Sequence, residues 1–156
     1  MKIVRRGIFE TNSSSSHSVS IATISGTLSD LLPVQDGTVR VSCGEFGWGY
    51  ETHTDSETKL SYLVTSLFQK IRADGCTIEK DIKIVKKSNK FLMLQKVIKE
   101  WCNAKIEVVS NMDYYMFGYI DHQSSGVPDE VFVNKETIAN FLFNPHSILV
   151  IDNDNH

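Results

Sequence analysis

The sequence predicts one α+β domain over residues 1–156, with a mainly antiparallel sheet and about three helices packed on it. Two observations favour this fold class. Residues 17–21 alternate polar and apolar side chains with the period of a strand, whereas residues 60–71 repeat apolar side chains with the period of a helix. Strands and helices are expected in mixed order, without a regular strand-helix-strand rhythm. The 156 residues are 41% hydrophobic and 22% charged, which is typical of a folded domain.

The expected strands are short and differ in how they alternate. His17–Ile21 is expected to be half-buried, with His17, Val19 and Ile21 on one face. Asp113–His122 is apolar on both faces, which is typical of a central strand. Shorter strands are expected at Val39–Cys43, Ile106–Val108, Glu130–Val133 and Ser147–Ile151.

Three helices are predicted from capping residues and from apolar residues at helical spacing. The first begins after Asp55, a preferred N-cap, and ends before Asp74 and Gly75. The second follows the cap Ser88 and runs to about Trp101. The third covers Lys135–Phe143 and ends before Pro145. Loops are expected over Thr27–Gly37, with a turn at Asp36-Gly37, and over the glycine-rich stretch from Cys43 to the start of the first helix near Asp55.

Charge, cysteine content and missing motifs exclude several classes of protein. The net charge is −3, so the chain has neither a bulk basic field for duplex DNA nor the strong acidity of a DNA mimic. Its three cysteines are far apart and form no C-x-x-C, which is typical of buried free thiols in a reducing cytosol. No Walker, H-E-x-x-H or G-x-S-x-G motif occurs. With no run of 18 apolar residues and no signal peptide, no membrane partner is expected.

The serine run Ser13–Ser16 offers hydroxyl groups for anion binding. Hydroxyls and the N–H groups of a turn can surround an anion, and a neighbouring arginine adds positive charge. We therefore assign anion contact to Ser14, Ser15, Ser16 and Arg6. The alternative is a loop in which the serines bond only with the backbone around them.

A polar site is predicted where two strands begin and end. If the strand that begins at His17 and the strand that ends at His122 are antiparallel neighbours, these two histidines lie at the same edge of the core. They could then perform acid–base chemistry on a phosphoester or orient an anionic ligand. Glu45 and Asp121 are expected to support them as carboxylates. The alternative is two unconnected histidines, each half-buried and hydrogen-bonded.

The glycine-rich loop and a lysine segment are two further candidates for binding. Glycines allow close approach of the backbone to a ligand, and Trp48 or Tyr50 could stack on a base or sugar. Alternatively, Phe46, Trp48 and Tyr50 cover the edge of the core while the glycines make turns. Lys80–Lys90 could contact phosphates or an acidic protein, or form an ordinary solvated surface. The candidate residues have no metal-coordinating spacing, and the sequence predicts no particular cofactor.

Four segments together resemble a group of small, largely uncharacterised proteins encoded by bacteriophages, prophages and Firmicute-type bacteria. They are RRGIFETNSSSSHSVSI, GEFGWGYETHTDSETKLSYL, GYIDHQSS and NFLFNPHSILVIDNDN, of which F-E-T-N-S-S-S-S-H-S is the most specific. The resemblance implies an intracellular accessory role linked to phage. Small phage proteins of this type often act on host metabolism or counter host defence systems, including CRISPR.

Two functions of different classes follow from these features. The first is a site that binds a nucleotide or a nucleic-acid end, with hydrolysis of the phosphate ester left open. The second is a non-catalytic inhibitor or adaptor of anti-CRISPR type, which would bind a host protein through the lysine segment or the aromatic loop. Both functions would place the chain in the cytoplasm of a bacterial host, and neither fixes an oligomeric state.

Overall fold

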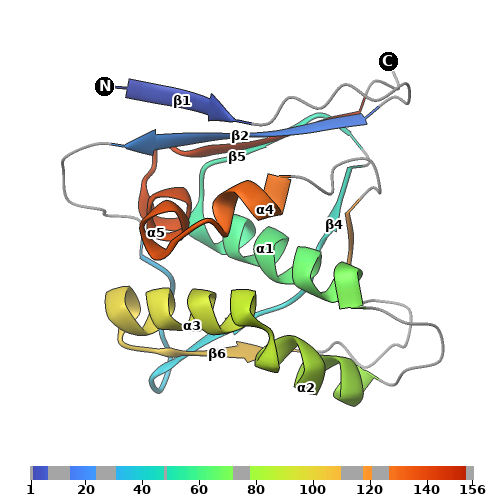
Figure 1. Ribbon diagram of the computed structural model, residues 1–156, viewed down its shortest axis with the longest axis vertical. Helices are drawn as coiled ribbons and strands as arrows, with labels where there is room; N and C mark the ends of the chain where they lie inside the picture. Colours follow the sequence, from blue (N-terminus) through green and yellow to red (C-terminus); the bar gives the residue numbers. More distant parts are fainter. Residues whose placement is uncertain are drawn as a thin grey trace.

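The structure, a computed structural model, describes residues 2–6, 15–23, 31–47, 49–71, 78–109, 118–120 and 127–153. These residues form helices and strands around one hydrophobic core (Figure 1). The strands are β1 (Lys2–Arg6), β2 (Ser15–Thr23), β3 (Thr38–Val41), β4 (Glu45–Phe46), β5 (Glu51–His53), β6 (Lys105–Val108), β7 (Tyr119–Ile120) and β8 (Ile148–Asn153). The helices are α1 (Ser56–Ile71), α2 (Ile78–Lys87), α3 (Asn89–Cys102), α4 (Val127–Val131) and α5 (Lys135–Phe143). The predicted α+β class is confirmed.

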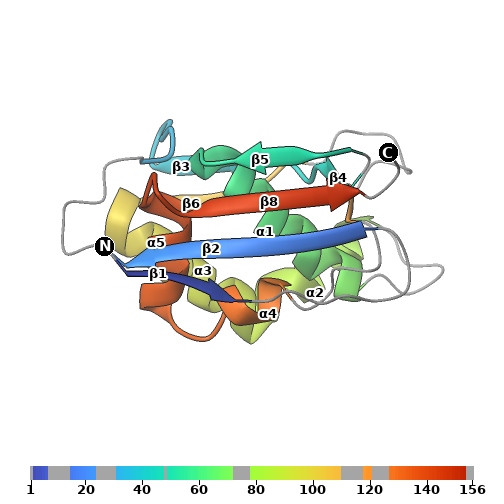
Figure 2. The same cartoon turned by 90° about the horizontal axis from the view of Figure 1, so that it is seen from above.

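The largest sheet is four-stranded and antiparallel, in the order β1-β2-β8-β5 (Figure 2). Val19 of β2 pairs with Leu149 of β8, and Leu149 pairs in turn with His53 of β5. Val19 and Ile21 are 2% and 6% exposed, so the predicted inward face of this strand is confirmed at both positions. Strand β8 therefore joins the N-terminal hairpin of β1 and β2 to β5.

Two further pairs of strands are parallel. Strand β3 pairs with β6, from Thr38 beside Lys105 to Val41 beside Val108. Strand β4 pairs with β7. In Figure 1, α1, α4 and α5 lie between the four-stranded sheet and a second layer that contains α2, α3 and β6. The sequence did not predict the parallel pairs, because partners so far apart in the chain leave no local signal.

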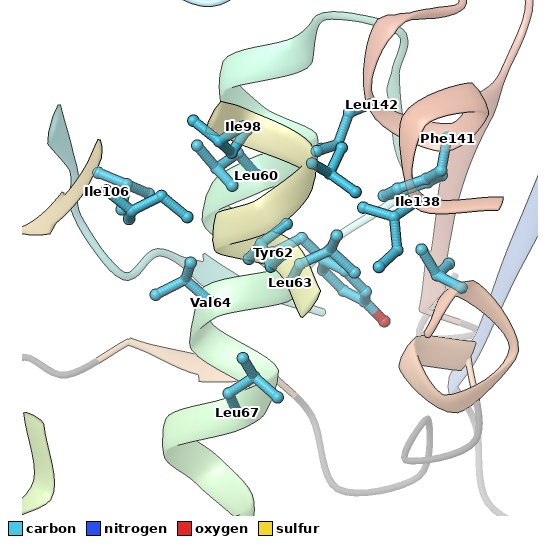
Figure 3. Packing of buried hydrophobic residues seen from close by; sticks show 14 of the residues in the cluster. Leu60, Tyr62, Leu63, Val64, Leu67, Ile98, Ile106, Ile138, Phe141 and Leu142 are labelled. Atoms are coloured by element: carbon cyan, nitrogen blue, oxygen red, sulfur yellow. The ribbon is translucent and has the colours of Figure 1, made fainter. Parts of the chain in front are cut away.

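Helix α1 runs through the middle of the core. Asp55 caps its start, as predicted, by accepting a hydrogen bond from the N–H of Thr58 at 2.7 Å. Its apolar side chains lie between Ile106 of β6 and Ile138 of α5 (Figure 3). The buried residues of this predicted series are Leu60, Leu63, Val64, Leu67 and Phe68. Burial of each such side chain contributes about 1.5–3 kcal/mol.

Two of the five helices were not predicted as helices. Helices α3 and α5 each begin at a capping residue. Ser88 Oγ, the predicted cap of α3, accepts a hydrogen bond from the N–H of Phe91 at 3.2 Å, and Asn134 Oδ1 accepts one from the N–H of Thr137 at 2.8 Å. The predicted strand Glu130–Val133 is wrong, since its first two residues end α4. A proline and two acidic residues in the first turn favour that helix over the strand pattern. Helix α2 occupies the lysine segment, where no element was expected.

Left-handed backbone occurs at the turn of Asp36 and Gly37 and at Gly118. Asp36 and Gly37 have φ of 52° and 70°, and the N–H and C=O groups of Gln35 and Thr38 bond across them at 2.9 Å, which confirms the predicted turn. Gly118 has φ of 62°, and a Cβ there would lie 2.2 Å from the backbone oxygen of Gly44. The predicted continuous strand Asp113–His122 is therefore wrong at Gly118, and its other residues, apart from β7, lie outside the described residues.

A buried lysine ties α1 to the turn that precedes β8. Lys59 is 0% exposed, and its Nζ donates hydrogen bonds to the backbone oxygens of Asn144 and Ser147, each at 3.3 Å. Ser56, one turn earlier, donates to the oxygen of Leu142 at 2.6 Å. These bonds satisfy carbonyl groups at the C-terminus of α5, where a positive charge is also favourable.

Candidate functional site

Several predicted site residues gather at one end of the four-stranded sheet. At this end β1 and β8 finish while β2 and β5 begin (Figure 2). Across the sheet, His17 of β2 pairs with Ile151 of β8, and Ile151 pairs with Glu51 of β5. Positions 17 and 51 are thus separated by two strand spacings, about 10 Å.

The hydroxyl run enters the sheet at the same end. Ser15 pairs with Asn153, and Ser16 pairs with Asp152. Arg6, the last residue of β1, pairs with Val19, two residues further into β2. The backbone therefore brings the predicted anion contacts Arg6, Ser15 and Ser16 to one sheet end, whereas Ser14 lies outside the described residues.

The predicted neighbour relationship behind the two-histidine site is wrong. Strand β2 lies between β1 and β8, whereas β7 pairs in parallel with β4 in a separate sheet. The polar residues at the start of one strand and the end of the other suggest that these two strands are neighbours, but the observed strand order does not pair them. His122 itself lies outside the described residues, as do Asp121 and Trp48.

Glu45 does meet the second predicted segment. It pairs with Tyr119, and Phe46 pairs with Ile120, the residue that precedes Asp121 in the sequence. The side chain of Glu45 is exposed, and two exposed aromatic residues lie nearby in the chain or across the pair: Tyr50 at 64% and Tyr119 at 38%. The alternative, in which these aromatic side chains cover the core edge, fits buried Phe46 but not exposed Tyr50.

A histidine–glutamate pair at the same sheet end was not predicted. His53 Nε2 donates a hydrogen bond to Glu51 Oε2 at 2.8 Å, with the two side chains 22% and 38% exposed. The two residues are separated by one position in β5, so both project from the same face of the strand. The sequence Glu-Thr-His, in an extended segment, is the signal that could have indicated this pair. The glycines that precede it predict a loop instead.

Aromatic rings hold the histidine of this pair in place. The ring of Phe46 lies edge-on to His53 at 6.4 Å, and on its other side edge-on to Tyr62 at 5.2 Å. Phe46 is buried and belongs to β4, so it connects the paired side chains of β5 to the strand that carries Glu45. A carboxylate on one imidazole nitrogen fixes the tautomer, which leaves Nδ1 as the basic nitrogen.

A second carboxylate, that of Asp55, lies near His53. Partial burial acts to raise the pKa of Asp55, but the hydrogen bonds from Thr58 and the nearby His53 outweigh it, so the pKa lies below its usual value. Asp55 is therefore ionised at neutral pH, beside the pair of His53 and Glu51. Among the described residues, no group of three or more His, Cys, Asp or Glu side chains could hold a metal ion.

Comparisons of the chain with family models, curated proteins and solved structures gave no match. No helix in the described part of the chain is long and apolar enough to cross a membrane.

Proposed function

We propose that the chain binds a phosphate-bearing ligand, such as a nucleotide or a nucleic-acid end, at the sheet-end site. This site is defined as Arg6, Ser15, Ser16, His17, Glu51 and His53. The observation that supports the proposal is the register of β1, β2, β8 and β5, which brings the backbone of Arg6, Ser15, Ser16 and His17 to the end of the sheet where Glu51 and His53 lie. Hydroxyl, arginine and imidazolium groups are the donors that a phosphate accepts.

The flanking residues extend the proposed site toward a base or sugar. Exposed Tyr50 and Tyr119 offer faces for stacking, as proposed for Trp48. The carboxylates of Glu45 and Asp121 would repel a phosphate directly, so their proposed role is to orient histidines rather than to contact the anion. With the phosphate-binding groups on one side and the aromatic rings on the other, the ligand's phosphate would lie toward Arg6 and its base or sugar ring toward β4.

Hydrolysis is the reaction that the pair of His53 and Glu51 could support. Water would attack phosphorus while its proton passes to Nδ1 of His53, and Glu51 would stabilise the imidazolium that forms. The bond from phosphorus to the leaving oxygen would break, and that oxygen would take a proton from a second acid, the role assigned to His17. Such a base contributes about 10²-fold or more to a rate.

The proposed setting is an accessory role for a phage or mobile element in the cytoplasm of its bacterial host, in host takeover or anti-defence. This part rests on the resemblance described under Sequence analysis. A second candidate function is a non-catalytic inhibitor or adaptor of a host defence protein, and the exposed aromatic residues Tyr50 and Tyr119 favour it.

A thermal-shift and cleavage assay tests the proposed ligand. The probes are ATP, and one oligonucleotide with either a 5′-phosphate or a 5′-hydroxyl. At a concentration of 100 times Kd, the phosphorylated probe should raise Tm by about 5–10 °C. Equal shifts with the two oligonucleotides, or no shift with any probe, would contradict phosphate binding.

Matched variants separate the sheet-end site from the rest of the surface. His17→Ala and Arg6→Gln should abolish the shift, and His53→Gln should remove any cleavage. His146→Gln is the control, because His146 is exposed and precedes the start of β8, at the opposite end of the sheet. A loss of binding in the control as well would indicate unfolding or a different site.

A further inference from the structure

The backbone groups of β3 alternate between two edges, and only one edge is occupied by β6. The N–H of Lys105 donates to the oxygen of Gly37 at 2.9 Å, and the N–H of Val109 to that of Val41 at 2.8 Å. In a parallel ladder the groups of alternate residues point to opposite sides. Residues 37, 39 and 41 therefore face β6, whereas the N–H and C=O groups of Arg40 and Ser42 face away from it.

Side chains cover the corresponding outer edges of the neighbouring strands. On β6, Gln95 accepts a hydrogen bond from the N–H of Ile106 at 2.8 Å and donates to the oxygen of Ala104 at 3.2 Å. On β7, Gln69 accepts from the N–H of Ile120 at 3.0 Å and donates to the oxygen of the same residue at 2.6 Å. Each glutamine therefore makes the two hydrogen bonds, one donated and one accepted, that the backbone of a further strand would make.

The outer edge of β3 is covered on both sides of Arg40 but not at Arg40. Thr38 bonds with Gln35 across the turn, and the oxygen of Ser42 accepts from Ser61 Oγ at 2.7 Å. The N–H of Gly44, one step further, donates to Thr65 Oγ1 at 3.0 Å. Within the described part of the chain, no hydrogen bond is made by the N–H or C=O group of Arg40.

This uncovered position opens onto a hollow between β3 and the start of α1, which we name the β3 groove. Its volume is about 240 Å³, and residues 39–41 of β3, followed by Ser42, line one side. Leu32, Pro33 and Leu60 supply apolar surface, while Glu57 and Thr58 of α1 form the polar wall opposite. A strand edge facing a helix across an open groove is the arrangement to which extended peptides add as a further strand.

The charges of the β3 groove select the class of peptide. The guanidinium of Arg40 is engaged by Glu107, with Nε 3.1 Å from Oε2. Glu57 is exposed and has no ion pair among the described residues, and the Asp55 carboxylate lies two residues earlier at the same helix start. A carboxylate ligand would be repelled by these two side chains, whereas a lysine or arginine would be attracted.

We propose that the β3 groove binds an extended peptide segment of a partner protein, which pairs with the backbone of Arg40 and places a lysine or arginine beside Glu57. The backbone pairing supplies affinity, and the acidic wall supplies specificity. The residues that line the β3 groove include none of the sheet-end site, so the two functions can be tested with separate variants.

Hydrogen exchange tests the pairing directly on the full chain. The probe is a displayed library of random eight-residue peptides, panned on the immobilised protein, followed by synthetic copies of the enriched peptides. In the free protein the amide of Arg40 should exchange quickly, and those of Val39 and Val41 slowly. Bound peptide should slow exchange at Arg40 at least tenfold. No enriched peptide, or an enriched peptide that leaves Arg40 unprotected, would overturn the proposal.

Two pairs of variants complete the test. Arg40→Pro removes the outward N–H while leaving the ladder to β6 intact, and Arg40→Ala keeps that N–H. Peptide affinity should fall at least tenfold in the first and remain within about threefold in the second. If Arg40→Pro does not fold, Glu57→Lys should weaken binding at least tenfold, and Glu136→Lys, in the first turn of α5, should not. Equal binding by both members of either pair would overturn the proposal, as would a dimer that protects Arg40 without peptide.

Discussion

The side-chain oxygen of Gln95 accepts a hydrogen bond from the backbone N–H of Ile106, 2.8 Å away, at the open edge of β6. The same side chain donates to the oxygen of Ala104, so one residue of α3 satisfies a donor and an acceptor of a strand. Both backbone groups belong to buried residues. Buried groups without partners are costly, which makes this contact a stabilising link between helix and sheet rather than a surface detail.

Replacing Gln95 with leucine should destabilise the chain by about 2–4 kcal/mol, because it leaves both buried groups without this partner. Gln95→Glu is the matched control. Its carboxylate can still accept from Ile106 but cannot donate to Ala104, so about half of the loss is expected. Urea denaturation measures both values. Equal stability of the leucine variant and the wild type would show that water replaces the glutamine.

Lys59→Met should destabilise the chain by about 2–4 kcal/mol, because the oxygens of Asn144 and Ser147 lose a buried cationic donor. Lys59→Ala should cost about 1–2 kcal/mol more, since it also removes the buried aliphatic stem and leaves a cavity. Denaturation midpoints compare the two variants. A methionine variant more stable than the wild type would mean that the desolvation cost of the charge exceeds its hydrogen bonds.

Asp129 should stabilise the fold only above acidic pH. Hydrogen bonds from Lys70 and then Lys90 hold the pKa of Asp129 below its usual value, against a smaller opposing effect of burial. A carboxyl group whose pKa is lower in the folded state stabilises the fold fully above its unfolded pKa of about 3.9. This stabilisation is lost as the pH falls through the pKa of the folded state. Asp129→Asn should therefore destabilise the chain at pH 7 but much less at pH 3.

The size of that difference is limited by exposure. The Asp129 side chain is 52% exposed and its two partners are about as open, so screening by solvent keeps the loss at pH 7 below about 1 kcal/mol. Denaturation at both pH values, with and without 1 M salt (a roughly 3 Å screening length), separates the charge effect from packing. A difference that is unchanged by pH and salt would indicate packing.

Cys43 should react slowly with iodoacetamide at pH 8. Burial raises the pKa of its thiol to about 11, despite an opposing hydrogen bond from Thr65. Because the thiolate is the reactive form, the rate should fall roughly 100-fold relative to an ordinary thiol. Mass spectrometry of the alkylated peptides measures this rate. Labelling of the urea-unfolded chain is the control, and equal rates in both states would contradict burial of the thiol.

Elements with a strong local pattern could be predicted from the sequence. Helix α1 follows from apolar residues at helical spacing after Asp55, and the turn at Asp36-Gly37 follows from its two residues. Helix α2 has a comparable pattern, with Ile78, Ile82 and Val85 at helical spacing between an acidic first turn and a basic last turn, but the prediction for this segment rests on its lysines alone. The predicted strand at Glu130–Val133 is wrong because the β-branched residues Val131 and Val133 alternate as they would in a strand.

The candidate site was predictable in its residue types but not in its assembly. The strand was predicted to begin at His17, with the serine run leading into it, and it begins two residues earlier, at Ser15. Position 17 lies opposite Glu51 across β8, and that relationship depends on the insertion of β8 between β2 and β5. Pairing over such separations is set by the whole core, so the polar end of Asp113–His122 was matched to the wrong strand.

The central place of β8 has a consequence for how the chain is made. During translation β2 and β5 emerge 125 and 95 residues ahead of the strand that joins them, since they end at Thr23 and His53 and β8 begins at Ile148. Synthesis at about 5–20 residues per second leaves both strand edges uncovered for several seconds. A nascent chain stalled before Ile148 should therefore bind chaperones and be cut rapidly by proteases, whereas one stalled well beyond Asn153 should resist both.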